Sequence, residues 1–222
     1  MMPRTPETRF LRPLLLALAL LAGGASPARP QGAAADSARI ARADLARIKG
    51  AESARVWLVV VSDFQCPFCK QWHDETAERI DREYVRTGKV RVAYLNYPIS
   101  THRNARPAHE AAMCAAEQGA FWPMADALFG TQDAWKNRGD ARAFFDSLAG
   151  TLPLDHTRLR ACVRDGALRS LIQADVDRVM RRGVGSTPTF FAGSYVLVGA
   201  QPFEIFKQAL DRAVADATAD RP

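Results

Sequence analysis

Residues 56–72 read VWLVVVSDFQCPFCKQW, and this stretch decides the fold. Its first six residues form a continuous apolar run, which predicts a strand covered on both faces. A helical pattern follows that run, and Cys66 and Cys69 lie at the turn between the two. Residues 90–94 then alternate as a second strand. The first half of the chain is therefore predicted to be strand, helix, strand, with both cysteines at the start of the helix.

The rest of the chain predicts helices first and strands again near its end. Residues 189–192 and 195–198 flank Gly193 and Ser194, a tight hairpin signal, and a last helix opens at Pro202. Helical apolar spacing covers five segments before that hairpin: 105–118, 121–129, 142–148, 157–164 and 167–182. The predicted fold class is α/β, a mixed sheet with an inserted all-helical subdomain.

The predicted domain boundaries follow these changes of pattern. A flexible leader at 29–35 and a short helix at 36–49, ended by Gly50, precede the sheet. The full division is a signal peptide at 1–28, leader and short helix at 29–50, a first part of the sheet domain at 51–103, a helical insertion at 104–182, a second part of the sheet domain at 183–217 and a tail at 218–222.

The first 28 residues have the pattern of a secretory signal. Arg4, Arg9 and Arg12 precede an apolar run at 14–22, and small residues allow cleavage after Ala25 or Ala28. An apolar run this short does not span a bilayer, which takes about 20 residues, although an uncleaved anchor is the alternative. We therefore expect an extracytoplasmic protein, in the periplasm or at the cell-envelope exterior, where disulfides persist.

Composition excludes several classes of protein. The chain has 222 residues, of which 48% are hydrophobic and 24% charged, and this excludes disorder, collagen and coiled coil. The formal net charge is +6, but the basic residues alternate with acidic ones instead of forming a block. A nucleic-acid partner is therefore not expected.

Cys66 and Cys69 have the spacing of a redox pair. A thiol at the first turn of a helix faces unpaired backbone N–H groups and the positive end of the helix dipole, which stabilise its thiolate. Such positions lower a cysteine pKa to roughly 3.5–7.5. We expect Cys66 to be the exposed attacking sulfur and Cys69 the shielded resolving thiol, with Pro67 preset at the first helical position.

Two other interpretations of this pair remain open. His73 completes a C-x2-C-x3-H pattern that suggests zinc, but no second cysteine pair or nearby histidine pair supplies a fourth ligand, so no metal site is predicted. The second alternative is a static disulfide closed over a very short loop.

The other two cysteines lie far apart in the helical region. Cys114 and Cys162 each lie among helix-face residues, and in an oxidising compartment they are predicted to form a structural disulfide. The alternative is two separate buried thiols that pack as small hydrophobic side chains.

The order of these motifs resembles one known family. A strand, a C-P-x-C at a helix start, a helical insertion and a Thr-Pro before the next strand are similar to the DsbA-like thiol:disulfide oxidoreductases of the thioredoxin superfamily. The matching stretches are residues 62–69, 117–122 and 185–191, and the resemblance spans about residues 48–217. It implies that the mixed sheet is thioredoxin-like, with its two parts at 51–103 and 183–217.

The resemblance implies roles for several further residues. Pro188 would be cis and pack against the cysteine pair, and Thr187 would bind an extended segment of a substrate through its backbone. Phe68 occupies the variable dipeptide that tunes thiolate stability and offers no donor. Many relatives carry a carboxylate where this chain has Val60. Either water or Asp63 would therefore accept the proton from Cys69, or this proton transfer would be slower, and Asp63 also fits a solvated turn or cap.

The expected function is therefore oxidation of exported proteins. The resemblance implies a monomer that introduces disulfides into proteins with free thiols, is reoxidised by a membrane redox partner and needs no bound cofactor. Two alternatives remain. One is the same chemistry run as a reductase or isomerase, and the other is a thiol-based module for metal delivery or for holding client proteins.

Overall fold

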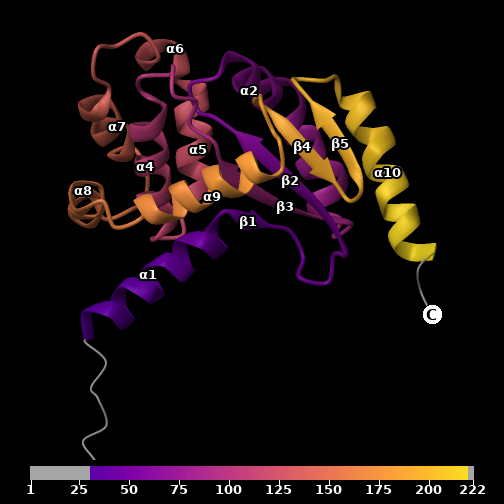
Figure 1. Ribbon diagram of the computed structural model, residues 1–222, viewed down its shortest axis with the longest axis horizontal. Coiled ribbons are helices and arrows are strands. Elements are labelled where there is room, and N and C mark those ends of the chain that lie inside the picture. Colours follow the sequence, from indigo (N-terminus) through magenta and orange to yellow (C-terminus); the bar gives the residue numbers. More distant parts are fainter. Residues whose placement is uncertain (1–30, 220–222) are drawn as a thin grey trace, which may run out of the picture.

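The fold is built on a five-stranded mixed sheet, seen in a computed structural model that describes residues 31–219 (Figure 1). The strand order is β1-β3-β2-β4-β5, and the central pair β2 and β3 is parallel, whereas the other neighbours are antiparallel. The strands are β1 (Ile48–Lys49), β2 (Val56–Ser62), β3 (Val90–Asn96), β4 (Thr189–Ala192) and β5 (Tyr195–Val198). The predicted fold class is confirmed.

Helices connect and cover these strands. A helical segment of alternating α and π turns joins β2 to β3, and a group of helices separates β3 from β4. The first segment consists of α2 (Pro67–Trp72), η1 (His73–Ala77), α3 (Glu78–Ile80) and η2 (Asp81–Val85). The others are α1 (Gln31–Ala46), α4 (Ala105–Ala116), α5 (Phe121–Gly130), α6 (Gln132–Trp135), α7 (Arg142–Ala149), α8 (His156–Asp165), α9 (Arg169–Arg181) and α10 (Phe203–Ala219).

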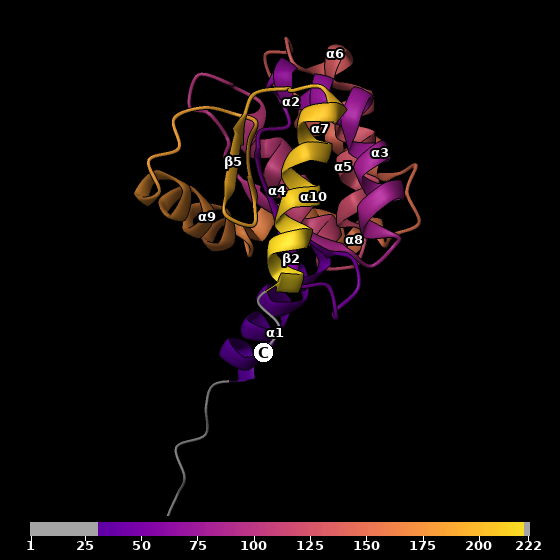
Figure 2. The ribbon, with the colours of Figure 1, turned by 90° about the vertical axis from the view of Figure 1, so that its right-hand side faces the viewer.

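The sheet separates two hydrophobic cores. Val56, Leu58 and Val60 alternate along β2 and pack with Trp72 and Phe206 on the side covered by α10. Figure 2 shows α10 lying across this side of the sheet. The second core surrounds Phe64 and Phe121 and fills the helical insertion, which explains how a single chain of this length buries two apolar clusters.

Three predicted boundaries are wrong. Residues 31–35, predicted as flexible leader, begin α1, because this alanine-rich stretch has high helix propensity. Ile48–Lys49, predicted as the end of a helix, forms β1, since it pairs with Val92 and Ala93 of β3. The last helix reaches Ala219, two residues into the predicted tail.

One short helix is absent from the sequence prediction. α6 (Gln132–Trp135) is a single turn whose Trp135 is fully buried, and it lies in a stretch to which the sequence pattern assigns no element. One helical turn gives too few apolar repeats to be recognised by spacing.

The predicted signal peptide, residues 1–28, and its cleavage sites lie outside the described residues. Within residues 31–219, no helix combines the length and the apolar character that crossing a bilayer would require.

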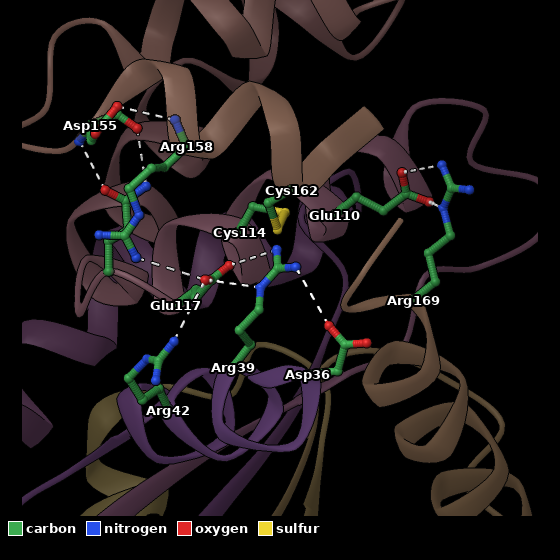
Figure 3. Close-up of a disulfide and its surroundings, with 11 residues drawn as sticks. Asp36, Arg39, Arg42, Glu110, Cys114, Glu117, Asp155, Arg158, Cys162 and Arg169 are labelled. Atoms are coloured by element: carbon green, nitrogen blue, oxygen red, sulfur yellow. Dashed lines mark hydrogen bonds and ion pairs between the residues drawn. A yellow bond between two sulfur atoms is a disulfide. The ribbon is translucent and has the colours of Figure 1, made fainter. Parts of the chain in front are cut away.

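A disulfide ties two helices of the insertion together. Cys114 of α4 and Cys162 of α8 are bonded, with Cα atoms 5.7 Å apart (Figure 3). Both are almost fully buried, so the bond lies inside the insertion core. Their neighbours in the sequence place them on the inner faces of their helices, as the pattern of apolar residues predicts.

A buried carboxylate joins α1 to the same insertion. Glu117, which follows α4, accepts two hydrogen bonds from Arg39 of α1, at 3.0 and 3.1 Å. Arg42 and Arg158 lie 3.8 and 3.7 Å from the same carboxylate (Figure 3). The Glu117 side chain is only 9% exposed, so its charge requires these cations. α1 is thereby fixed to α4 and α8 by one acidic group.

Removing the disulfide should cost stability without touching the sheet. A Cys114→Ala/Cys162→Ala variant loses the restraint on a 48-residue loop, and we expect its free energy of unfolding to fall by about 4 kcal/mol. Urea unfolding of the two oxidised proteins measures this difference. Free thiols at both positions in the oxidised wild type would contradict the bond.

Glu117→Gln should loosen α1. Loss of the charge-assisted hydrogen bonds is expected to lower the free energy of unfolding by about 1–2 kcal/mol and to speed amide exchange along α1. Asp146→Asn is the matched control, because Asp146 pairs only with exposed Arg160 among the described residues. Equal effects of both variants on α1 exchange would disprove the role of Glu117.

Candidate active site

The two cysteines lie at the turn from β2 to α2, with Cys66 directly before the helix and Cys69 in its first turn. Cys66 has extended backbone angles and Pro67 is the first helical residue, so α2 begins directly behind the Cys66 sulfur. Cys66 is 4% exposed and Cys69 is fully buried. Both are free thiols in this structure. The predicted order of accessibility is confirmed, but the prediction of an exposed Cys66 is wrong, because the cysteine turn is packed into the core and the residue is buried.

The second predicted motif packs directly against the first. The Thr187–Pro188 peptide bond is cis, and the Cys66 thiol donates to the Thr187 carbonyl oxygen at 3.4 Å across 121 residues of sequence. Phe68, in contrast, points away from the core and is 59% exposed. Thr187 and Phe68 therefore border the Cys66 sulfur.

Hydrogen bonding makes Cys66 unusually acidic. The hydrogen bond from the Cys69 side chain is the largest cause. Together with Thr187 and the N–H groups of Phe68 and Cys69, it outweighs the opposing effect of burial. The pKa of Cys66 is lowered to about 6. At neutral pH the sulfur is mostly thiolate, which is the nucleophilic form.

Cys69 has the opposite character. Burial is the first cause that raises the pKa of its thiol well above the usual value, and the neighbouring Cys66 raises it further. The opposing groups are the Asp63 N–H, which donates to the Cys69 sulfur at 3.4 Å, and the Ser62 side chain. The pair thus contains one sulfur that ionises readily and one that holds its proton.

Asp63 is buried, not solvated. Its side chain is completely inaccessible, so the interpretation as a solvated turn residue is wrong. The carboxylate accepts from the Gln65 N–H at 2.8 Å, the Ile99 N–H at 2.9 Å and His102 Nδ1 at 2.7 Å. The backbone of Asp63, and not its carboxylate, is hydrogen-bonded to Cys69.

A second buried histidine lies behind this carboxylate. His109 of α4 donates from Nδ1 to Asn96 at 2.7 Å, and its Nε2 lies 3.9 Å from Asp63 without a hydrogen-bond partner among the described residues. Burial lowers the pKa of His109 to about 4, so the ring is neutral at pH 7. Asn96 in turn donates to Asp175 of α9, which pairs with Arg47.

Gln132 of α6 holds the cysteine turn in place. Its side-chain amide donates to the carbonyl oxygens of Phe64 at 2.7 Å and Cys66 at 3.0 Å, and it is fully buried. Local spacing carries no signal for Gln132, His102 or His109, because their partners lie far along the chain. Sequence reasoning therefore misses all three.

Two further residues considered in the sequence analysis are Val60 and His73. Val60 is buried in the sheet core. His73 directly follows α2, as the first residue of η1, and is hydrogen-bonded to Asp74 and Asp126 at 3.0 Å each. Across residues 31–219, no group of three or more side chains has the arrangement of a metal site.

Comparison with known proteins gives the family. The sequence pattern of the family described as Thioredoxin matches residues 44–212. The chain belongs to the thioredoxin family. Among solved structures, α-DsbA1 of Wolbachia pipientis has a TM-score of 0.70 at 20% identity, covering 78% of this chain and 92% of that one. BdbD of Bacillus subtilis has a TM-score of 0.69 at 19% identity, covering 76% and 92%. The resemblance to DsbA-like proteins is thus confirmed as a shared fold within the thioredoxin family.

Relatives in sequence fall into two groups. The Na(+)/H(+) antiporter NhaA 3 of Salinispora tropica is 34% identical over 74% of this chain, and the chain spans about a quarter (24%) of that relative's length. The Probable disulfide bond formation protein D of Bacillus anthracis is 24% identical over 72% of this chain and 74% of its own.

Alkylation should distinguish the two thiols. We expect iodoacetamide to modify only Cys66 of the reduced protein near pH 7, with a rate that is half-maximal at about pH 6. In Cys69→Ala this half-point should move to higher pH, because the largest cause of the lowered pKa is gone. Mass mapping after timed alkylation measures both. A half-point close to the ordinary thiol value of 9.0 would contradict the site described.

Proposed function

We propose that the protein is an extracytoplasmic dithiol:disulfide oxidoreductase that introduces disulfides into exported proteins through Cys66 and Cys69. The observation that carries the proposal is the contrast between an acidic Cys66 and a buried Cys69 whose thiol keeps its proton. A stabilised thiolate favours the reduced protein, and this makes the disulfide form a better oxidant. The export pattern of residues 1–28 supports the location.

The reaction is two successive thiol–disulfide exchanges. A client thiolate attacks Cys66 of the disulfide form, an S–S bond forms between client and Cys66, and Cys69 leaves with the electron pair. A second client thiolate then attacks the client sulfur of this mixed disulfide, and Cys66 leaves as thiolate. The client loses two electrons and the enzyme gains them. A disulfide of a membrane redox partner takes these electrons back and restores the oxidised enzyme.

Proton exchange at Cys69 is assigned to the Asp63 region. Cys69 takes up a proton when it leaves, since its pKa is well above the usual value, and it releases that proton on reoxidation. The Asp63 N–H donates to the Cys69 sulfur and cannot relay a proton, so we propose that the Asp63 carboxylate, which contacts the partly exposed His102, exchanges the proton with Cys69 directly or through water.

Client binding is assigned to the residues that border Cys66. The Thr187 backbone beside Pro188 would pair with an extended client segment, and the exposed Phe68 ring would pack against apolar client side chains. We propose that the protein acts as a monomer. The relative named Probable disulfide bond formation protein D supports the oxidising direction.

The redox potential tests the direction. Equilibration with glutathione buffers should place the Cys66–Cys69 pair near the strongly oxidising end, at about −120 mV, and a catalytic amount of oxidised protein should speed disulfide formation in a reduced model protein. Cys66→Ser should abolish the reaction. The Cys114→Ala/Cys162→Ala variant is the control and should retain it, because that bond lies apart from the reacting sulfurs.

Two results would overturn the proposal. A potential at about −270 mV would assign the protein to the reductases. Tight stoichiometric zinc binding without any thiol exchange would make it a metal-delivery module instead.

A further inference from the structure

The segment between β3 and α4 brings a histidine to the back of the cysteine turn. His102 Nδ1 lies 2.7 Å from the Asp63 carboxylate, and the His102 side chain is 24% exposed. Asp63 is three residues before Cys66 and donates its N–H to Cys69. A titratable ring that reaches solvent is therefore joined through Asp63 to the Cys69 sulfur, and the Asp63 carbonyl oxygen accepts from the Cys66 N–H at 3.1 Å.

The buried carboxylate of Asp63 needs a cation. Its two backbone donors, Gln65 and Ile99, are neutral, and burial keeps the nearby His109 uncharged. Among the described residues, Asp63 forms ion pairs with histidines alone and with no arginine or lysine. His102 is thus the group that can neutralise it.

A bare carboxylate at this position would work against the Cys66 thiolate, because like charges repel in a site largely closed to water. A protonated His102 makes the Asp63 pair neutral overall and places a positive charge near the sulfur. Attraction between His102 and Cys66 also contributes to the raised pKa of His102. Such coupling is reciprocal, so the imidazolium stabilises the thiolate to the same extent. Phe68 inside the C-x-x-C cannot supply this charge.

We propose that His102 is a positioning residue of the redox pair, whose imidazolium neutralises Asp63 and so holds the Cys66 sulfur as thiolate. This inference rests on the proposed function, since a more stable thiolate makes the protein a stronger oxidant.

The charge states of His102 and Cys66 determine how the stabilisation of the thiolate changes with pH. The hydrogen bond to Asp63 is the first cause that raises the pKa of His102 above 6.5, so its charge is present at lower pH and is lost as pH rises through the raised value. The Cys66 thiolate forms above about pH 6. The stabilisation is therefore largest between these limits and fades in alkaline solution.

The other titratable groups around the pair add no net charge in that range. Burial raises the pKa of Cys69 on α2 and of Tyr94 on β3 well above their usual values, and His109 on α4 is neutral. Asp175 on α9 and Arg47 form an ion pair whose charges offset each other. The pH dependence is therefore assigned to His102 and Cys66.

The test is a thiolate titration of the reduced protein, followed by ultraviolet absorbance. In His102→Gln we expect the acid dissociation constant of Cys66 to fall roughly three- to tenfold, and the equilibrium constant for oxidising glutathione to fall by a similar factor. His102→Lys keeps a cation and should restore both values. His73→Gln is the matched control, since His73 is equally exposed (23%) but pairs with Asp74 and Asp126.

Outcomes separate this inference from the proposed function. If His102→Gln titrates like the wild type, or if His102→Lys behaves like His102→Gln, the role of His102 is wrong even where the protein oxidises clients. If the wild type oxidises no client, the proposed function fails, while the titration still decides the role of His102.

Discussion

The chemistry of this protein depends on hydrogen bonds to a sulfur atom that is almost buried. Burial alone would raise the pKa of Cys66, yet the Cys69 thiol, the N–H groups at the start of α2 and the neighbouring Thr187 lower it. The first two come from the strand-to-helix turn, and Thr187 comes from the other end of the insertion. The mixed sheet brings β2 and β4 together, so that these groups converge on the sulfur.

Local sequence patterns predict most of the fold, but they fail for elements whose formation depends on contacts with residues far along the chain. Both strands of the last hairpin have the expected bounds, because Gly193-Ser194 and the alternation around it are contained within ten residues. Ile48–Lys49 is different, since only pairing with β3 makes it a strand. α6 is fixed by burial of Trp135 and by contacts of Gln132 with the cysteine turn, which no nearby residue signals.

The same distinction holds for the active site. The C-x-x-C and the Thr-Pro occur in the order typical of DsbA-like proteins, and it is this resemblance that predicts that Cys66, Cys69 and Pro188 lie together. Asp63 can be noticed but not understood from the sequence, because its decisive partner His102 lies 39 residues further on. A carboxylate at the end of a strand is ordinarily solvated, and the loop after β3 is what encloses this one.

The buried carboxylates of Glu117 and Asp63 are neutralised by different cationic groups, and the difference matches the different roles of the two sites. Glu117 is surrounded by three guanidinium groups, which stay charged at any physiological pH, so the attachment of α1 is constant. Asp63 is paired with imidazole, whose charge changes near neutrality. Arginine beside Asp63 would fix the electrostatics of the sulfurs, whereas histidine makes them depend on pH. The architecture therefore remains rigid while the reactivity of Cys66 can respond to its surroundings.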